Sequence, residues 1–283
     1  MTRAQDLLAD GVAQLRAAGI AGAARDARWL LAHALGIAPD RVTLVLLDPV
    51  TAGQAARFQD AIAARARHQP VAQILGTRLF WGRNFHVTPD VLDPRPETET
   101  LIAAALEHPF DTVLDLGTGS GAILLTLLAE RPRAQGLGVD LSSQALNIAQ
   151  RNAQTLGLAT RARFTRAHWF DEVQGDYDLI VSNPPYIASG DYADLAPELR
   201  LWEPRMALVP KGCDGSGLAA YRAIIASAPA FLRPAGRLLV EIGLGQGPAV
   251  QALMTGAGLR DIRILPDMTG RARVVAAQAA GGH

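Results

Sequence analysis

The chain has 283 residues, of which 49% are apolar, and its 27 Lys and Arg residues balance 27 Asp and Glu residues. This length allows two domains, and the balanced charge provides no strong field to recruit nucleic acid or an anionic membrane. The only cysteine, Cys213, excludes a disulfide framework and a thiolate metal cluster; we interpret it as a passive thiol and expect no metal. The sequence shows neither a signal peptide nor an apolar run of membrane-spanning length, so we expect a soluble, cytoplasmic protein without a membrane partner.

Residues 1–75 are predicted to form a small all-α bundle. Apolar residues recur at helical spacing from Leu7 to Leu15. Gly36 ends a second helical run, and Thr51 is a suitable N-cap for a third helix. No chemical motif marks this domain, so its function is expected to lie in its surface.

Residues 76–92 are predicted to form a β-hairpin linker, because Phe80, Trp81 and Phe85 cluster between glycines instead of recurring at helical spacing. The next stretch, Pro94-Arg95-Pro96-Glu97-Thr98-Glu99, has prolines followed by acids, which is typical of the first turn of a helix. We expect this helix to open the last domain, residues 93–283.

Strands and helices alternate from Asp111 onward, which indicates a parallel sheet and an α/β fold. The first predicted unit consists of strand Thr112–Leu116, turn Gly117–Gly121 and helix Ala122–Glu130. A second strand is expected to end at Asp140 and a third to include 163–164. Two more strands are expected at 176–182 and 237–242, followed by a final hairpin of 262–265 and 273–277. Further helices are expected from Ser142 or Ser143 to Asn152, at 221–232 and at 246–257.

The glycine-rich turn and the acid at the end of the second strand indicate a nucleotide-type cofactor. Glycines allow a tight turn and a close approach of the ligand to the backbone. Asp140 can accept two hydrogen bonds from a ribose diol. The spacing Gly117-x-Gly119-x-x-Ala122 also satisfies the permissive dinucleotide fingerprint, so by itself it leaves a nicotinamide-dependent oxidoreductase open.

Two observations favour S-adenosylmethionine over a dinucleotide. Asp115, just before the glycine turn, suits the ammonium of this cofactor and would repel a pyrophosphate. The run Asn183-Pro184-Pro185-Tyr186 follows a buried strand, where an acceptor for the methyl group would lie. Asn183 Oδ1 and the Pro184 carbonyl are acceptors for the two hydrogens of a planar –NH₂ group, and Tyr186 offers a face for stacking. A dehydrogenase would need an acid or base there, and the prolines supply neither.

The chain resembles the peptide chain release factor glutamine methyltransferases, the PrmC/HemK family, over nearly its whole length. The resemblance is carried by the runs 94–99, 113–121 and 178–186, with additions at 203–208 and from Glu241 to Gln246. It implies a class I (Rossmann-like) S-adenosylmethionine-dependent methyltransferase domain. It also implies that the N-terminal domain helps to dock the release factor. Asp93 and His168 depart from the usual residues of the family.

The resemblance also implies the site residues. The substrate glutamine would be held by Asn183, Pro184, Pro185 and Tyr186. The implied contacts with the cofactor, together with Asp115, are Gly117, Thr118, Gly119, Ser120, Gly121, Asp140, Trp169 and Asn183.

The expected function is methylation of the side-chain amide nitrogen (N5) of glutamine in the Gly-Gly-Gln motif of release factors 1 and 2, with S-adenosylmethionine as methyl donor. The alternatives are an amino-methyltransferase of DNA or RNA bases and an enzyme acting on a glutamine of another translation protein. Methylation of bases would require base extrusion and a basic track for phosphates, and the zero net charge argues against it. A cofactor-binding protein without turnover is a third, non-enzymatic alternative, which the intact run 183–186 disfavours.

Overall fold

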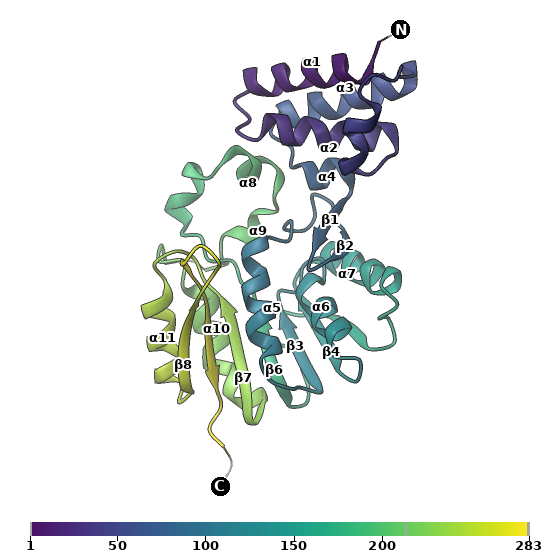
Figure 1. Ribbon diagram of the computed structural model, residues 1–283. Coiled ribbons are helices and arrows are strands. Elements are labelled where there is room, and N and C mark those ends of the chain that lie inside the picture. Colours follow the sequence, from purple (N-terminus) through teal and green to yellow (C-terminus); the bar gives the residue numbers. More distant parts are fainter. Residues whose placement is uncertain (1, 213, 282–283) are drawn as a thin grey trace. The chain divides into compact units, whose positions relative to one another are not determined.

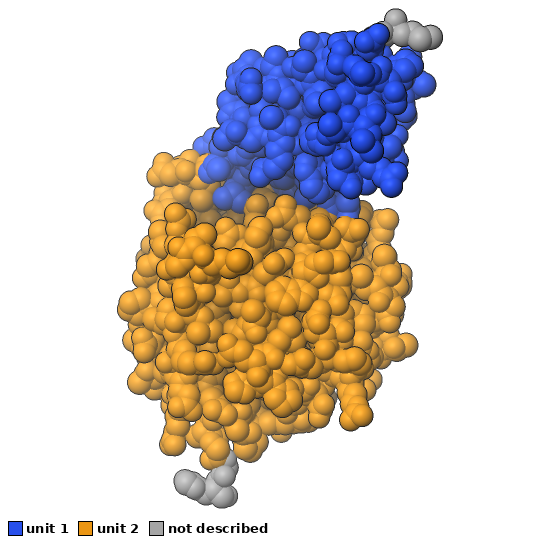
Figure 2. All heavy atoms as spheres, viewed as in Figure 1, with its two compact units in different colours: residues 1–77, 196–202 blue, residues 78–195, 203–283 orange. Residues whose placement is uncertain are grey.

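The computed structural model describes residues 2–212 and 214–281 (Figure 1). Cys213, interpreted above as a passive thiol, therefore lies outside the described residues. The chain divides into two compact units, coloured separately in Figure 2: residues 1–77 with 196–202, and residues 78–195 with 203–283. In the described part of the chain, no helix combines the length and apolarity needed to cross a membrane.

The first unit is a bundle of helices around a small apolar core. Phe58 and Ile62 are buried there with Leu15, Leu30 and Leu31. Its elements are α1 (Ala4–Ala17), α2 (Ala23–Leu35), η1 (Pro39–Val45), α3 (Ala52–Ala66), α4 (Val71–Leu75) and α8 (Pro197–Trp202).

A buried arginine joins α8 to the rest of the first unit. The Arg65 guanidinium pairs with Asp26 Oδ2 at 2.8 Å and with Glu198 Oε1 at 3.0 Å. Gln73 Nε2 donates to the Trp202 carbonyl at 2.9 Å, and Trp202 Nε1 donates to the Arg67 carbonyl at 2.9 Å. Residues 196–202, which the sequence placed in the last domain, thus group with the bundle.

The second unit is built on a twisted sheet. Among the described residues, this sheet has seven strands in the order β5-β4-β3-β6-β7-β9-β8. The pairs from β5 to β7 are parallel, and β9 runs antiparallel to both of its neighbours. The strands are β3 (Thr112–Leu116), β4 (Gln135–Asp140), β5 (Ala162–Arg166), β6 (Tyr177–Ser182), β7 (Leu232–Glu241), β8 (Arg260–Pro266) and β9 (Ala272–Gln278).

Helices cover both faces of this sheet, as the alternation of buried residues along the strands requires. Val113 and Leu179 pack in one cluster against α5 and α6, whereas Leu114 and Ile180 pack in another against α10 and α11 (Figure 1). The helices are α5 (Glu99–Leu106), α6 (Ala122–Glu130), α7 (Ser143–Thr155), α9 (Arg205–Leu208), α10 (Ala219–Ser227) and α11 (Gly247–Gly256), with short 3₁₀ segments η2 (Pro96–Thr98), η3 (Ser189–Asp194) and η4 (Ala228–Phe231).

The strand order places a topological switch point at the centre of the sheet. From β3 the chain continues to β4 on one side, and it later returns to β6 on the other side of β3. The connections that follow β3 and β6 therefore lead in opposite directions from the carboxyl ends of these two strands. In open α/β sheets, ligands bind in the crevice that this divergence leaves.

The predicted hairpin consists of β1 (Thr77–Phe80) and β2 (Arg83–His86). The buried Asn152 of α7 holds it in place: Asn152 Oδ1 accepts from the His86 N–H at 2.7 Å and Nδ2 donates to the His86 carbonyl at 3.0 Å. The same Nδ2 donates to the Ser120 carbonyl at 2.8 Å. One amide thus ties the hairpin to the glycine-rich turn.

Two regions differ from the expected elements. The helix expected at 221–232 ends at Ser227 and gives way to η4, and β7 begins at Leu232, earlier than expected. Pro229 lacks the backbone N–H that a continuing helix needs, which explains the early end. The segments η3, α8 and α9 were not expected, because residues 189–208 show no long apolar period.

We predict that Gly136→Ala destabilises the second unit by about 1–3 kcal/mol. A Cβ at Gly136 in β4 would lie 2.5 Å from Leu124 Cδ1 and 2.8 Å from Val113 Cγ1. Gly256→Ala is the matched control, because nothing lies within 4 Å of its Cβ position. It should be neutral or stabilising by up to about 1 kcal/mol. Urea unfolding followed by circular dichroism tests both, and equal midpoints would contradict the prediction.

Candidate active site

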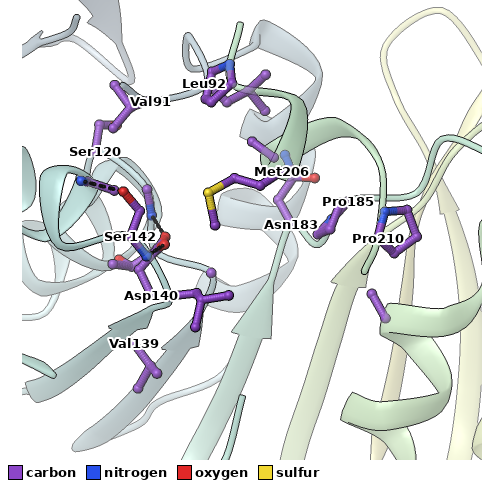
Figure 3. Close-up of a pocket in the computed structure, with 18 of the residues that line it drawn as sticks. Val91, Leu92, Ser120, Val139, Asp140, Ser142, Asn183, Pro185, Met206 and Pro210 are labelled. Carbon is purple, nitrogen blue, oxygen red and sulfur yellow. Dashed lines mark hydrogen bonds between the residues drawn. The ribbon is translucent and has the colours of Figure 1, made fainter. Parts of the chain in front are cut away.

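A cavity of about 860 Å³ opens at the carboxyl ends of β3, β4 and β6, entirely within the second unit (Figure 3). It is lined by the glycine-rich turn, by residues 139–142 and 167–169, by Asn183 and by the segment 204–212. The cavity therefore lies at the switch point of the sheet.

The glycine-rich turn forms one wall of the cavity and depends on left-handed backbone. Gly117 has φ = 73° and Gly119 has φ = 56°, values that side chains other than glycine rarely adopt. The N–H groups of Gly117 and Thr118 both donate to the Val139 carbonyl, at 2.8 and 2.9 Å. This turn is thus fixed to the end of β4.

Asp115 and Gly121, both predicted to contact the cofactor, do not line this cavity. Asp115 is fully buried, and its Oδ2 accepts from Thr118 Oγ1 at 2.6 Å and from the Leu124 N–H at 3.3 Å. Burial raises the pKa of Asp115 to about 7. A Cβ at Gly121 would lie 3.2 Å from Ala149 Cβ, so this glycine allows α6 and α7 to approach closely. We therefore assign both residues to the support of the turn.

Asp140 connects the glycine-rich turn to the start of α7. Its Oδ2 accepts from the Gly119 N–H and its Oδ1 from the Ser142 N–H, both at 2.9 Å. Burial raises the pKa of the carboxyl, although these hydrogen bonds favour its ionised form. Each oxygen has a further lone pair, so the carboxylate can also accept from a diol in the cavity.

Trp169 lies on the same wall and is held in an uncommon backbone conformation. Its φ is 55°, a value that costs free energy for a bulky residue and that clusters at functional sites. Both His168 and Trp169 line the cavity, with ring centroids 5.7 Å apart and an angle of 50° between the rings. They offer a non-polar surface for a flat ring.

The four residues of the run 183–186 have different positions. Asn183 and Pro185 line the cavity, whereas Pro184 is buried and Tyr186 does not line it. The Tyr186 ring packs so closely against Gly243 that a Cβ there would lie 2.9 Å from Tyr186 Cδ2. The Tyr186 carbonyl accepts from Gln246 Nε2 at 3.0 Å. The predicted stacking of Tyr186 on a substrate therefore stays a prediction.

The side-chain amide of Asn183 has a defined orientation. Its Nδ2 donates to Thr98 Oγ1 at 3.3 Å, and the carboxylate of Glu241 faces the same amide. Because the nitrogen is turned towards these two groups, Oδ1 is the amide atom that faces the cavity. An acceptor oxygen thus stands where the –NH₂ group of a substrate is expected.

Several residues in the cavity wall or directly behind it were not predicted as site residues. The buried carboxylate of Glu203 accepts from Arg95 Nη2 at 2.8 Å and from the Asp93 N–H at 3.2 Å. This contact joins the motif 94–99 to the segment 203–208. Met206 of that segment points its thioether into the cavity (Figure 3). Both motifs were visible in the sequence, but only as a resemblance without a geometric role.

The chain is similar to known proteins over both units. Residues 6–76 match the model of the PrmC N-terminal domain, and residues 93–213 match that of the methyltransferase small domain. A release factor glutamine methyltransferase of Cereibacter sphaeroides is 59% identical over 98% of both chains. One from Rhodospirillum rubrum is 46% identical over 96% of this chain and 84% of its own.

The chain belongs to the release factor glutamine methyltransferase family. It is thus a methyltransferase, and its fold agrees with those of solved methyltransferases. One from Pyrococcus furiosus superposes with a TM-score of 0.54 at 14% identity, over 71% of this chain and 91% of its own. A 16S rRNA methyltransferase of Thermus thermophilus gives a TM-score of 0.51 at 22% identity, over 72% of this chain and 49% of its own. The expected class I methyltransferase fold with a helical N-terminal domain is confirmed.

The residues of the cavity fit S-adenosylmethionine, the cofactor of this class. Asp140 provides acceptors for a ribose diol, and Trp169 provides a surface for a base. Asp115 Oδ1 is buried and has no hydrogen-bond partner in the described part of the chain, but Asp115 does not line the cavity, so its contact with the cofactor ammonium stays a prediction. Gly117 and Gly119 line the cavity without side chains, so a ligand can approach the protein backbone closely there.

Asp140→Ala should weaken S-adenosylmethionine binding by about 1.5–3 kcal/mol, the scale of hydrogen bonds to a charged group. The substitution removes the ribose acceptor and the anchor of the Gly119 N–H. Titration calorimetry measures the change, with the exposed Asp171→Ala as control. Unchanged affinity in Asp140→Ala would show that this carboxylate does not bind the cofactor.

Proposed function

We propose that this protein methylates the side-chain amide nitrogen (N5) of the glutamine in the Gly-Gly-Gln motif of release factors 1 and 2. Membership of the family supports this proposal, and the fixed amide of Asn183 beside a cofactor cavity is the structural observation behind it. A primary amide presents two donor hydrogens and a weakly nucleophilic nitrogen. Asn183 Oδ1 and the Pro184 carbonyl are the acceptors that we assign to those hydrogens.

The chain's own residues act mainly by orientation and electrostatics. When bound, S-adenosylmethionine supplies a methyl group activated by the charge of its sulfonium. Asn183 Oδ1 and the Pro184 carbonyl hold the substrate –NH₂ so that its nitrogen faces that group. Both oxygens also stabilise the positive charge that develops on the nitrogen in the transition state.

No phenolate is needed to remove the remaining proton. Burial raises the pKa of Tyr186 to about 12, so its phenol stays protonated at neutral pH. The methylated amide is far more acidic while it carries positive charge, and its proton can pass to solvent. Apolar side chains around the reacting groups, including Pro185, Met206 and Val139, limit water that would compete for the acceptors.

The bundle is the part of the chain that we assign to docking of the release factor. Leu44 and Leu47 are 78% and 66% exposed on it, which is unusual for leucines so close together. A glycine-rich loop carries little information for recognition, so a second contact would raise its effective concentration at Asn183. These substrates would place the enzyme in the cytoplasm, with no nucleic acid or membrane as partner.

Asn183→Ala should lower turnover by about 10²-fold or more, because the lost acceptor acts mainly in the transition state. Affinity for S-adenosylmethionine should change much less. Single-turnover methylation of release factor 1 and calorimetry of the cofactor separate the two effects. Near-normal turnover would exclude the proposed role of Asn183.

A substrate panel tests the proposed function itself. Release factors 1 and 2 should be methylated, a short Gly-Gly-Gln peptide weakly, and duplex DNA and ribosomal RNA not at all. Methylation of nucleic acid with a steep dependence on salt, and none of either release factor, would establish the base methyltransferase instead.

The bundle is best tested on its surface, because removing residues 1–70 would leave α8 without its partners. The double variant Leu44→Ser, Leu47→Ser should raise KM for the release factors and leave methylation of the peptide unchanged. Exposed Met268→Ser in the second unit, outside the motifs of the site, is the control. An unchanged KM would argue against docking through these leucines.

A further inference from the structure

We propose that Glu241 is a positioning residue of the methyl transfer: with the Thr98 hydroxyl, its carboxylate fixes the Asn183 amide so that Oδ1 faces the substrate. This inference rests on the proposed function, and it gives a role to the motifs 94–99 and 241–246. Pro94, Arg95 and Thr98 of the first motif line the cavity.

The register of the sheet brings Glu241 beside Asn183. Ser182, the last residue of β6, pairs with Val240 of β7, so the next residues of the two strands are neighbours. Thr98 reaches the same point from η2, at the start of the helix that follows the hairpin. Glu241 is 2% exposed and Thr98 is 4% exposed, so the group they form is shielded from water.

The direction of each hydrogen bond follows from the atoms present. Asn183 Nδ2 donates to the Thr98 oxygen at 3.3 Å, which leaves the single hydrogen of this hydroxyl for the neighbouring Glu241 carboxylate. The carboxylate also faces the Asn183 amide, and its Oε2 is buried without a hydrogen-bond partner among the described residues. The groups around this end of the Asn183 amide are acceptors, so the amide nitrogen, and not Oδ1, must point towards them.

A rotated amide would be strongly disfavoured. Oδ1 would then face the carboxylate and the lone pair of the Thr98 oxygen, with no hydrogen between them. Leaving buried groups of this kind unpaired costs about 1–3 kcal/mol, and more for a charged group. The network thus holds Asn183 in the one orientation that offers an acceptor to the substrate.

The charge of Glu241 adds an electrostatic effect to the orientation. A negative carboxylate behind the –NH₂ of Asn183 polarises this amide and makes Oδ1 a stronger acceptor. The other titratable or charged groups that face Glu241 are Arg273 of β9, Glu97 of η2 and the phenols of Tyr186 and Tyr221. The Arg273 guanidinium also pairs with Asp267 at 3.2 Å, so its charge is shared.

The pH profile of turnover distinguishes this role from a merely structural one. Burial raises the pKa of Glu241 to about 7. The carboxylate form predominates above this pH, so turnover should fall as the pH is lowered through about 7. Glu241→Gln can preserve hydrogen bonds and shape but carries no charge, so it should lower turnover and remove this step from the profile.

Thr98 provides the finer test, because Thr→Val changes the hydroxyl and little of the volume. Thr98→Val should lower kcat on release factor 1 by roughly 10- to 100-fold, the range for loss of groups that orient a reacting residue. The dissociation constant of S-adenosylmethionine should change by less than about threefold. Thr98→Ser, which restores the hydroxyl, should recover most of the activity. The matched control is Thr126→Val in α6, another fully buried threonine, which should leave kcat unchanged.

Four results would decide the outcome with the full chain, S-adenosylmethionine and release factor 1. Wild-type kcat in both Thr98→Val and Glu241→Gln would overturn the inference. It would also be overturned if Thr98→Val lowered kcat, cofactor affinity and the melting temperature together. Failure of Thr98→Ser to recover activity would overturn it as well. A wild-type enzyme that methylates neither release factor would instead refute the proposed function, which keeps the two failures distinct.

Discussion

One row of paired residues across the sheet determines the site. Leu116 of β3 pairs with Ser182 of β6, and Ser182 pairs with Val240 of β7. Ser182 Oγ also donates to the Leu116 carbonyl at 2.6 Å, which fixes the row. The residues that follow it are Gly117, Asn183 and Glu241. The cofactor turn, the acceptor that we propose for the substrate and the carboxylate that we propose to orient it thus lie at one level, at the carboxyl ends of three neighbouring strands.

Buried carboxyl groups support each part of the site. Stability of the fold favours their protonated forms, whereas their hydrogen bonds in the site favour the charged forms. Burial raises the pKa of Asp115, Glu203 and Glu241 to about 7 in each case. Since these values lie above those of the unfolded chain, the stability that the raised values contribute is present at low pH and is lost as the pH rises through about 7. The charged forms are nevertheless the better acceptors for Thr118, Arg95 and Asn183. Such perturbed groups are typical of functional sites.

Local patterns predicted most of the elements and the residues on the cavity wall. The strand Thr112–Leu116 and the helix Ala122–Glu130 have the expected bounds, because a glycine-rich turn separates two clear apolar patterns. Asp140 at the end of β4 and Asn183 directly after β6 line the cavity, as their positions relative to the strands predicted. The inward support of Asp115 and the contact of Glu203 with Arg95 were not predictable. Asp115 meets Thr118 and Leu124, which are near in sequence, but only the folded turn aims its carboxylate inward, and Glu203 meets Arg95 across 108 residues. No local period contains this information.

The grouping of α8 with the bundle has a consequence for synthesis of the chain. Residues 1–77 emerge from the ribosome first, but the unit they belong to also needs residues 196–202. Until those residues are made, Arg65 has its contact with Asp26 but lacks Glu198, and the Trp202 indole has not yet reached the Arg67 carbonyl. By then β3 to β6, with the glycine-rich turn and Asn183, have all been translated. The bundle therefore cannot be completed before the central strands have been translated.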